Sequence, residues 1–216
     1  MALQKELTAL KNENLAKFPE EVIQVLMQDL QKLSASGIVE KAPKVGDKIA
    51  NFSLPNHLGN VLNLETLRKE GPVVITFYRG GWCPYCNLEL KTYQEVLPEI
   101  KALGATLVAI TPENPDESLT TSERHNLKFE VLTDDKSLYA QELGLAFSLS
   151  EELRPLYKNF GIEVEKHNGE GQFNMPLAST FVVDTDGTIA FSFVKEDYTL
   201  RAEPSEVLEV LARLKK

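Results

Sequence analysis

The sequence contains few residues that bind transition metals: only two of its 216 residues are cysteines and only three are histidines. A structural zinc site takes about four such ligands. His57, His125 and His167 lie far apart along the chain, and two cysteines cannot complete a site by themselves. We therefore expect no metal centre.

The sequence also lacks a basic surplus and a long apolar run. Its net charge is −9 and no basic cluster stands out, which argues against a general nucleic-acid partner. No apolar stretch approaches the roughly 20 residues of a membrane-spanning helix, and the start lacks the apolar core of a secretory signal. We expect a cytoplasmic protein that binds neither nucleic acid nor membrane.

What the sequence does contain is one apolar and β-branched run, Val73 to Tyr78, that leads into its only two cysteines. Such a run between glycine-containing turns predicts a buried strand followed by a sharp turn. Pro84 is typical of the first position of a helix. This places Cys83 at or next to the helix N-cap and Cys86 in the first turn, where free backbone N–H groups and the helix dipole stabilise a thiolate.

The spacing of Cys83 and Cys86 favours redox chemistry. A buried cysteine usually behaves as a small hydrophobic residue, and an inert pair in the core is the alternative interpretation. A C-x-x-C pair at a strand-to-helix turn, with no other cysteine in the chain, is better explained as a redox pair. In a reducing compartment, such a pair indicates chemistry rather than cross-linking.

The chain divides into an N-terminal helical extension, residues 1–43, and one larger domain, residues 44–216. The extension shows two apolar stripes at helical spacing. They are formed by Leu3, Leu7 and Leu10 and by Val22, Ile23, Leu26, Met27, Leu30 and Leu33. We expect the second stripe to pack on the domain, and a dimerisation arm is the alternative.

The domain alternates between strand-like and helix-like segments, which predicts parallel strands with helices on the faces of the sheet. An Asp-Gly turn between two apolar runs predicts a late β-hairpin. The expected strands are 52–54, 61–63, 73–78, 105–111, 129–133, 179–183 and 188–193. The expected helices are 84–103, 118–126, 135–143, 150–160 and one from 204 onward, with a loop over 161–172.

Several segments resemble known redox proteins. The sequence from Trp82 to Cys86, WCPYC, resembles the active site of thioredoxin-fold proteins, and its CPYC core resembles a glutaredoxin motif. The segment 45–54 and the nine-residue step from Phe77 to Cys86 resemble peroxiredoxins of the AhpC/TSA (alkyl hydroperoxide reductase C and thiol-specific antioxidant) family. Glu89 matches a glutamate of that family's active site.

The resemblance covers about residues 45–216 and implies an α/β, thioredoxin-like fold. In such a fold a central mixed β-sheet has helices on both faces, and here the N-terminal helices are added to it. Four positions depart from the family pattern. Ala50 and Arg79 stand where prolines are usual, Cys83 where a threonine or serine binds peroxide, and Ala178 where an arginine is expected.

The first functional hypothesis that the resemblance implies is a thiol peroxidase. Cys86 attacks the O–O bond of hydrogen peroxide or an organic hydroperoxide and becomes a sulfenic acid. Cys83 then closes a disulfide with it, and a thioredoxin- or glutaredoxin-like dithiol reduces that disulfide.

Other residues are candidates for support of the cysteine pair. Arg79 is the nearest cation in sequence and a candidate for lowering the pKa of the thiolate, with a surface or structural role as the alternative. Trp82 and Tyr85 are expected to form walls of the cysteine pocket. Further arginines could reach the site from elsewhere in the chain, namely Arg124, Arg154 and Arg201.

The second hypothesis is a thiol–disulfide oxidoreductase in which Cys83, expected to lie nearer solvent, attacks first and Cys86 resolves the mixed disulfide. A third is a non-catalytic binding module that kept the fold. The resemblance also implies a homodimer. No cofactor beyond the cysteines is indicated, because no G-x-G-x-x-G nucleotide pattern occurs.

Overall fold

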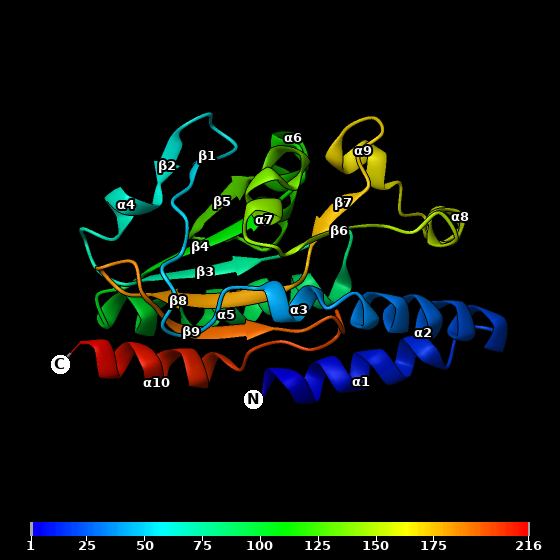
Figure 1. The fold of residues 1–216 in the computed structure, drawn as a ribbon, viewed down its shortest axis with the longest axis horizontal. Coiled ribbons are helices and arrows are strands. Elements are labelled where there is room, and N and C mark those ends of the chain that lie inside the picture. The colour runs from blue at the N-terminus through cyan, green and yellow to red at the C-terminus, as the bar shows by residue number, and fades with distance from the viewer. Residues whose placement is uncertain (1, 216) are drawn as a thin grey trace.

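The computed structural model describes residues 2–215, and a five-stranded mixed sheet forms its centre (Figure 1). The strand order is β5-β4-β3-β8-β9. β3, β4 and β5 run parallel, and β8 runs antiparallel to β3 and β9. The predicted mixed sheet with a late hairpin is confirmed. Its strands are β3 (Val73–Phe77), β4 (Thr106–Thr111), β5 (Glu130–Thr133), β8 (Ser179–Val183) and β9 (Ile189–Val194).

Strand β3 lies in the middle of the sheet and is fully buried. Alternate residues of a strand face opposite sides of a sheet. Val73, Ile75 and Phe77 accordingly belong to one core cluster and Val74 to the other. Thr76 faces the second side with Val74, and its partner across the strand pair is Thr180 of β8. This pairing places two hydroxyl groups together inside the protein.

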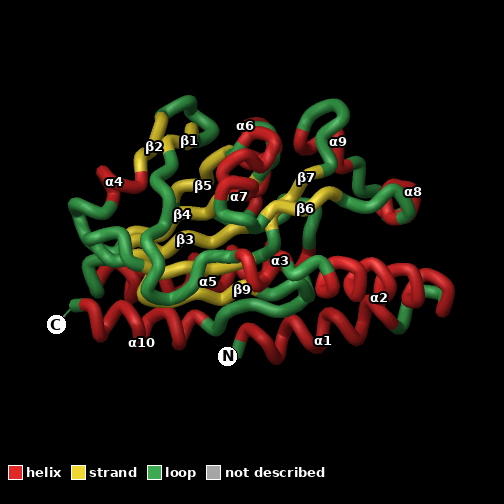
Figure 2. Tube along the Cα trace, in the orientation of Figure 1, coloured by secondary structure: helices red, strands yellow, loops and turns green. Residues whose placement is uncertain are grey.

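Helices cover both faces of the sheet, as predicted (Figure 2). One face carries α5 (Pro84–Ala102) and α10 (Pro204–Leu214), and the other carries α3 (Ile38–Lys41), α4 (Leu64–Leu67) and α7 (Leu138–Glu142). Helix α5 continues through Pro98 and has 19 residues. No helix within residues 2–215 combines the length and the apolar character needed to cross a bilayer.

Helices α1 (Leu3–Leu15) and α2 (Glu20–Ala35) form the N-terminal part of the structure. Leu3 and Leu7 of α1 are buried in the core cluster that contains α5. The stripe of α2 is only half covered. Leu26 and Leu33 pack against the domain, whereas Met27 is 56% exposed.

Several predicted boundaries are wrong. Helix α6 (Pro115–Arg124) starts before the predicted Ser118, because Pro115 is suited to the first helical turn. The predicted loop over 161–172 contains a short helix, α9 (Val164–Asn168), and two short strands were missed. The remaining elements are β1 (Ser53–Pro55), β2 (Val61–Asn63), a 3₁₀ turn η1 (Asp135–Ser137), β6 (Ala146–Ser148), α8 (Leu153–Asn159) and β7 (Asn174–Pro176).

Candidate active site

The two cysteines lie at the end of the turn that connects β3 to α5 and in the first turn of α5. Cys83 is the N-cap residue of α5, Pro84 is its first residue, and Cys86 lies in its first turn, as predicted. Both are free thiols and both are fully buried. Cys83 was predicted to lie nearer solvent, but it is as fully buried as Cys86, and the buried Arg79 guanidinium lies against its sulfur.

The turn before the cysteines fits only glycine. Gly80 has φ +156°, and a Cβ there would lie 2.3 Å from Trp82 Nε1 and 2.9 Å from Glu113 Oε1. A Cβ at Gly81 would lie 1.9 Å from Thr121 Oγ1. Such contacts are far closer than atoms tolerate, so a side chain at either position would displace the loop that presents the cysteines.

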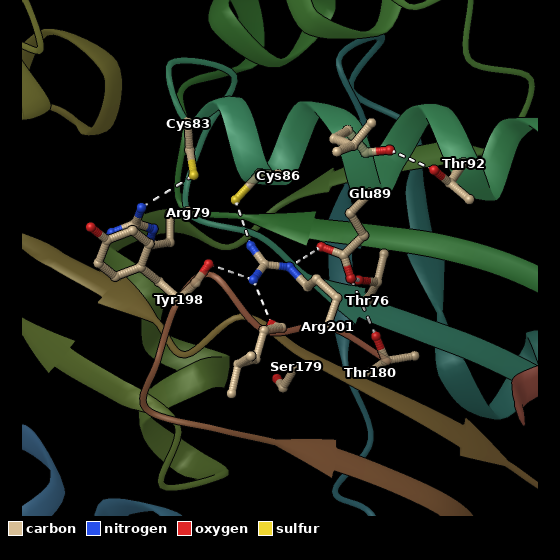
Figure 3. A network of polar contacts seen from close by, with 12 residues as sticks. Thr76, Arg79, Cys83, Cys86, Glu89, Thr92, Ser179, Thr180, Tyr198 and Arg201 are labelled. Carbon is tan, nitrogen blue, oxygen red and sulfur yellow. Dashed lines mark hydrogen bonds and ion pairs between the residues drawn. The ribbon is translucent and has the colours of Figure 1, made fainter. Parts of the chain in front are cut away.

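Arg79 contacts Cys83. Its guanidinium Nη2 donates to Cys83 Sγ at 3.2 Å (Figure 3). Its Nη1 donates to Tyr157 Oη at 3.0 Å. The guanidinium also lies over the rings of Trp82 and Tyr198, at 5.0 Å and 4.1 Å from their centroids. Aromatic faces stabilise a cation in this geometry, so Arg79 is a buried charge held against one sulfur rather than a surface residue.

Arg201 contacts Cys86, although it lies 115 residues away in sequence. Its Nη2 donates to Cys86 Sγ at 3.2 Å, and its Nε donates to the carboxylate of Glu89. Both partners of this ion pair are fully buried. The remaining Nη1 donates to the carbonyls of Tyr198 and Leu200 at 2.6 and 2.7 Å. Sequence reasoning named Arg201 among three arginines but gave it no role.

The Glu89 carboxylate is held by hydroxyl groups as well as by Arg201. Thr76 Oγ1 and Thr180 Oγ1 donate to Glu89 Oε1 at 3.2 and 3.5 Å (Figure 3). A buried carboxylate is costly unless its lone pairs are used. This explains two threonines on a buried strand pair, and it fixes Glu89 as the anchor for Arg201.

The charges of this cluster balance with one thiolate. Arg79 and Arg201 bring two positive charges and Glu89 brings one negative charge, so a single thiolate makes the buried group neutral. None of the carboxylates in residues 2–215 lies within ion-pair distance of Arg79, whereas Glu89 offsets Arg201. The negative charge is therefore favoured on the sulfur beside Arg79.

The pKa values of the two thiols move in opposite directions. Burial would raise the pKa of Cys83, but the hydrogen bond from Cys86 and the charges of Arg79 and Arg201 outweigh it, and the pKa falls well below its usual range. Burial and the neighbouring Cys83 raise the pKa of Cys86 well above its usual range despite Arg201. These directions favour the resting thiolate on Cys83 over Cys86.

A second polar group holds the glycine turn from outside the sulfur cluster. Glu113, buried beyond the end of β4, accepts the backbone N–H of Gly81 at 2.9 Å. His167 of α9 places Nδ1 3.3 Å from Glu113 and 3.1 Å from Glu117. The close Glu113 carboxylate raises the pKa of His167, against burial, and the charge of Glu117 raises it further.

The predicted wall residues and arginines are placed as follows. Trp82 and Tyr85 line a pocket at the start of α5 together with Tyr198. Arg154 instead stacks on Phe173 at 3.8 Å, and Arg124 is exposed at the end of α6. Sequence reasoning missed the contacts of Thr76, Thr180, Tyr157, Tyr198 and Glu113, because no spacing rule links these segments.

The chain was compared with known proteins. A family model described as the AhpC/TSA family matches residues 45–192. Peroxiredoxin Bcp of Escherichia coli K12 is 26% identical over 102 residues, which are 47% of this chain and 65% of that protein.

Solved structures show the same fold. The crystal structure of peroxidoxin BcpB from Mycobacterium tuberculosis superposes with a TM-score of 0.63 at 22% identity, covering 80% of this chain and 99% of that one. The bacterioferritin comigratory protein of Xanthomonas campestris superposes with a TM-score of 0.58 at 17% identity, covering 79% and 100%. These structures show that the fold is the thioredoxin-like fold of peroxiredoxins.

Proposed function

This chain belongs to the AhpC/TSA family, and from that premise we propose that it is a thiol peroxidase in which Cys86 and Cys83 act as one redox unit. Peroxiredoxins are thiol-dependent peroxidases, and the similar protein from X. campestris has alkyl peroxide reduction activity. The observation that carries the assignment to these residues is the contact of Cys86 with an arginine that is ion-paired to Glu89.

The first step oxidises Cys86. Its proton moves to the neighbouring Cys83 thiolate, and the resulting Cys86 thiolate is stabilised by Arg201, whose Nη2 contacts Cys86 Sγ. This thiolate attacks the terminal oxygen of a hydroperoxide, so that an S–O bond forms and the O–O bond breaks. The leaving alkoxide takes a proton from solvent and departs as an alcohol, or as water when the substrate is hydrogen peroxide.

The second step closes the disulfide. The Cys83 sulfur attacks the Cys86 sulfenic acid, an S–S bond forms, and the hydroxide leaves as water with the proton that Cys83 had taken up. An external dithiol of the thioredoxin or glutaredoxin type then reduces the disulfide by exchange. Arg79 stabilises the Cys83 thiolate that this exchange releases. A homodimer and a cytoplasmic location stay predictions.

The experiment that tests this function measures peroxide consumption by the reduced protein with dithiothreitol as reductant. Wild type is expected to turn over and Cys86→Ser to be inactive, and pre-reduced Cys83→Ser, freed of dithiothreitol, to consume one equivalent of peroxide rapidly. If wild type consumes hydrogen peroxide and cumene hydroperoxide no faster than Cys86→Ser does, the protein is not a peroxidase.

A second candidate function is a thiol–disulfide oxidoreductase, and one observation favours it. The lowered pKa of Cys83, beside an arginine that pairs with no carboxylate within residues 2–215, favours the nucleophile that the second hypothesis requires. Reduction of a small aromatic disulfide separates the two functions. A Cys83→Ser variant that still reduces this disulfide at the wild-type rate would rule out Cys83 as the attacking group.

A further inference from the structure

The N-terminal helices form part of the wall of a pocket at the cysteine pair. A cavity of about 380 Å³ lies over the start of α5. Its inner wall includes Arg79, Trp82 and Tyr85, and its outer wall includes Asn14, Phe18 and Leu26 from α1, α2 and the turn between them. Neither sulfur lies on the wall, but Arg79 does, and its guanidinium is 3.2 Å from Cys83 Sγ.

We propose that helices α1 and α2 complete a binding site for the organic group of a compact, uncharged organic hydroperoxide, which directs its O–O bond toward Arg79 and the two sulfurs. This inference rests on the proposed peroxidase function and names its substrate class. The helices precede residue 45, where the family match begins, so the specificity comes from a part of the chain outside that match.

The size of the cavity points to an organic substrate. One water molecule occupies about 30 Å³ in the liquid, and hydrogen peroxide is only slightly larger. The cavity is therefore much larger than one small peroxide molecule needs. Hydrogen peroxide would leave most of the space to water, whereas an organic hydroperoxide such as cumene hydroperoxide would fill more of it.

The chemistry of the wall points to an apolar group. The side chains of Phe18, Leu26, Trp82 and Phe160 supply aromatic and aliphatic surface around the cavity. Pockets for small molecules combine such a lining with a few polar groups that set orientation. Here Arg79 is the charged one, and its charge is engaged by the Cys83 thiolate, so the site offers no free cation for an anionic substrate.

Specific contacts hold the outer wall in place. Asn14 Nδ2 donates to Tyr85 Oη at 3.2 Å, and Phe18 stacks on Phe160 with ring centroids 4.8 Å apart. Lys11 pairs with Asp197 at 2.9 Å.

The start of α1 is tied to the segment that carries Arg201. The Glu203 carboxylate accepts the first backbone N–H groups of α1, from Leu3 and Gln4, at 2.9 and 2.8 Å. The backbone N–H of Arg201 donates to Gln4 Oε1 at 3.1 Å. The extension is thus fixed to the same segment that positions a catalytic cation.

The test compares the specificity constants for cumene hydroperoxide and hydrogen peroxide in full-length variants. Leu26→Phe puts bulk into the cavity. Met27→Phe is the matched control, because Met27 is the next residue in α2 and its side chain is 56% exposed. The ratio of kcat/KM for cumene hydroperoxide to that for hydrogen peroxide is expected to fall about tenfold in Leu26→Phe and to stay unchanged in Met27→Phe. An unchanged ratio in both variants would overturn the proposal.

A binding measurement separates this proposal from the peroxidase function. Trp82 is the only tryptophan of the chain and lines the cavity, so its fluorescence reports an occupant. The unreactive product alcohol 2-phenyl-2-propanol is expected to change this signal saturably in wild type and Met27→Phe, and about tenfold more weakly in Leu26→Phe. Binding without peroxide turnover would refute the peroxidase and keep the site. Turnover of cumene hydroperoxide without saturable binding of the alcohol would refute the site. Tighter binding of a dithiol peptide than of the alcohol would refute it as well.

Discussion

The two halves of the site each pair one sulfur with one arginine, and they differ in what else the arginine contacts. Arg201 donates to Cys86 and is ion-paired with Glu89, whereas Arg79 donates to Cys83 and meets aromatic rings and a phenol. Both arginines lie at the same distance from their sulfurs, 3.2 Å. The difference in net charge, rather than in distance, therefore decides which sulfur holds the resting thiolate.

This difference in charge gives the two sulfurs different roles in the reaction. In the Cys86 half, Glu89 offsets the charge of Arg201, so Cys86 stays protonated until its proton moves to Cys83. The Cys83 half keeps a thiolate, which is also the better leaving group when a reductant opens the disulfide. Changes to one half should therefore alter different steps from changes to the other half.

The largest expected effect comes from breaking the Cys86 half. Arg201→Met leaves Glu89 buried without its cation, which should lower the free energy of unfolding by about 3 kcal/mol. Loss of the cation at Cys86 should also slow peroxide reduction by about 100-fold. Urea unfolding and single-turnover kinetics measure the two effects.

A double variant separates stability from chemistry in that half. Arg201→Met combined with Glu89→Gln removes both charges, so most of the lost stability should return while the peroxide rate stays low. Wild-type peroxide rates in Arg201→Met would show that the contact with Cys86 has no catalytic role.

The next effect comes from the Cys83 half, measured in a Cys86→Ser background so that only one thiol is present. Arg79→Met removes the uncompensated cation and should raise the pKa of Cys83. The pH at which alkylation by iodoacetamide reaches half of its maximal rate should then move to a higher value. Arg124→Met, a change at an exposed arginine, is the control and should leave that pH unchanged. Equal midpoints in both variants would contradict the charge argument.

A smaller effect is expected from the hydroxyl groups that hold Glu89. Thr76→Val keeps the shape but removes a donor to a buried carboxylate, which should cost about 1.5 kcal/mol of stability. Thr92→Val is the matched control, since the Thr92 hydroxyl donates to the carbonyl of Leu88 in its own helix. A loss of stability in the control as large as in Thr76→Val would show that the effect is not specific to Glu89.

The smallest effect concerns His167, which lies outside both halves. Its folded pKa is raised by Glu113, so it stabilises the protein fully below its unfolded pKa of about 6.5. This contribution is lost as the pH rises through the higher folded pKa. The difference in unfolding free energy between wild type and His167→Gln should thus be larger at pH 5.5 than at pH 8.5. A difference that grows with pH would contradict the contact.

The sequence was sufficient to predict the parts of the site that are local. The run before Gly80, the helix start at Pro84 and the cysteine spacing all act within about one turn of backbone, where propensity and capping rules hold. The mixed sheet and the helices on both faces followed from the order of segments and from the family resemblance.

The long-range parts could not be predicted from the sequence. Arg201 reaches Cys86 from a segment without regular structure before α10, and Thr180 reaches Glu89 from a strand 91 residues away. Both contacts depend on packing that no periodicity encodes. The burial of Cys83 was missed for the same reason, because Arg79 lies against its sulfur and is itself packed on the ring of Tyr198, which is distant in sequence.

The central claim is that Cys86 receives the peroxide oxygen and Cys83 resolves it. The most direct test is intact mass after one equivalent of hydrogen peroxide, with a dimedone trap for sulfenic acid, on wild type and both single cysteine-to-serine variants. We expect wild type to lose two hydrogens and Cys83→Ser to carry dimedone on Cys86, with Cys86→Ser unlabelled. Dimedone on Cys83 in the Cys86→Ser variant, with Cys83→Ser unlabelled, would contradict the account and make Cys83 the attacking sulfur.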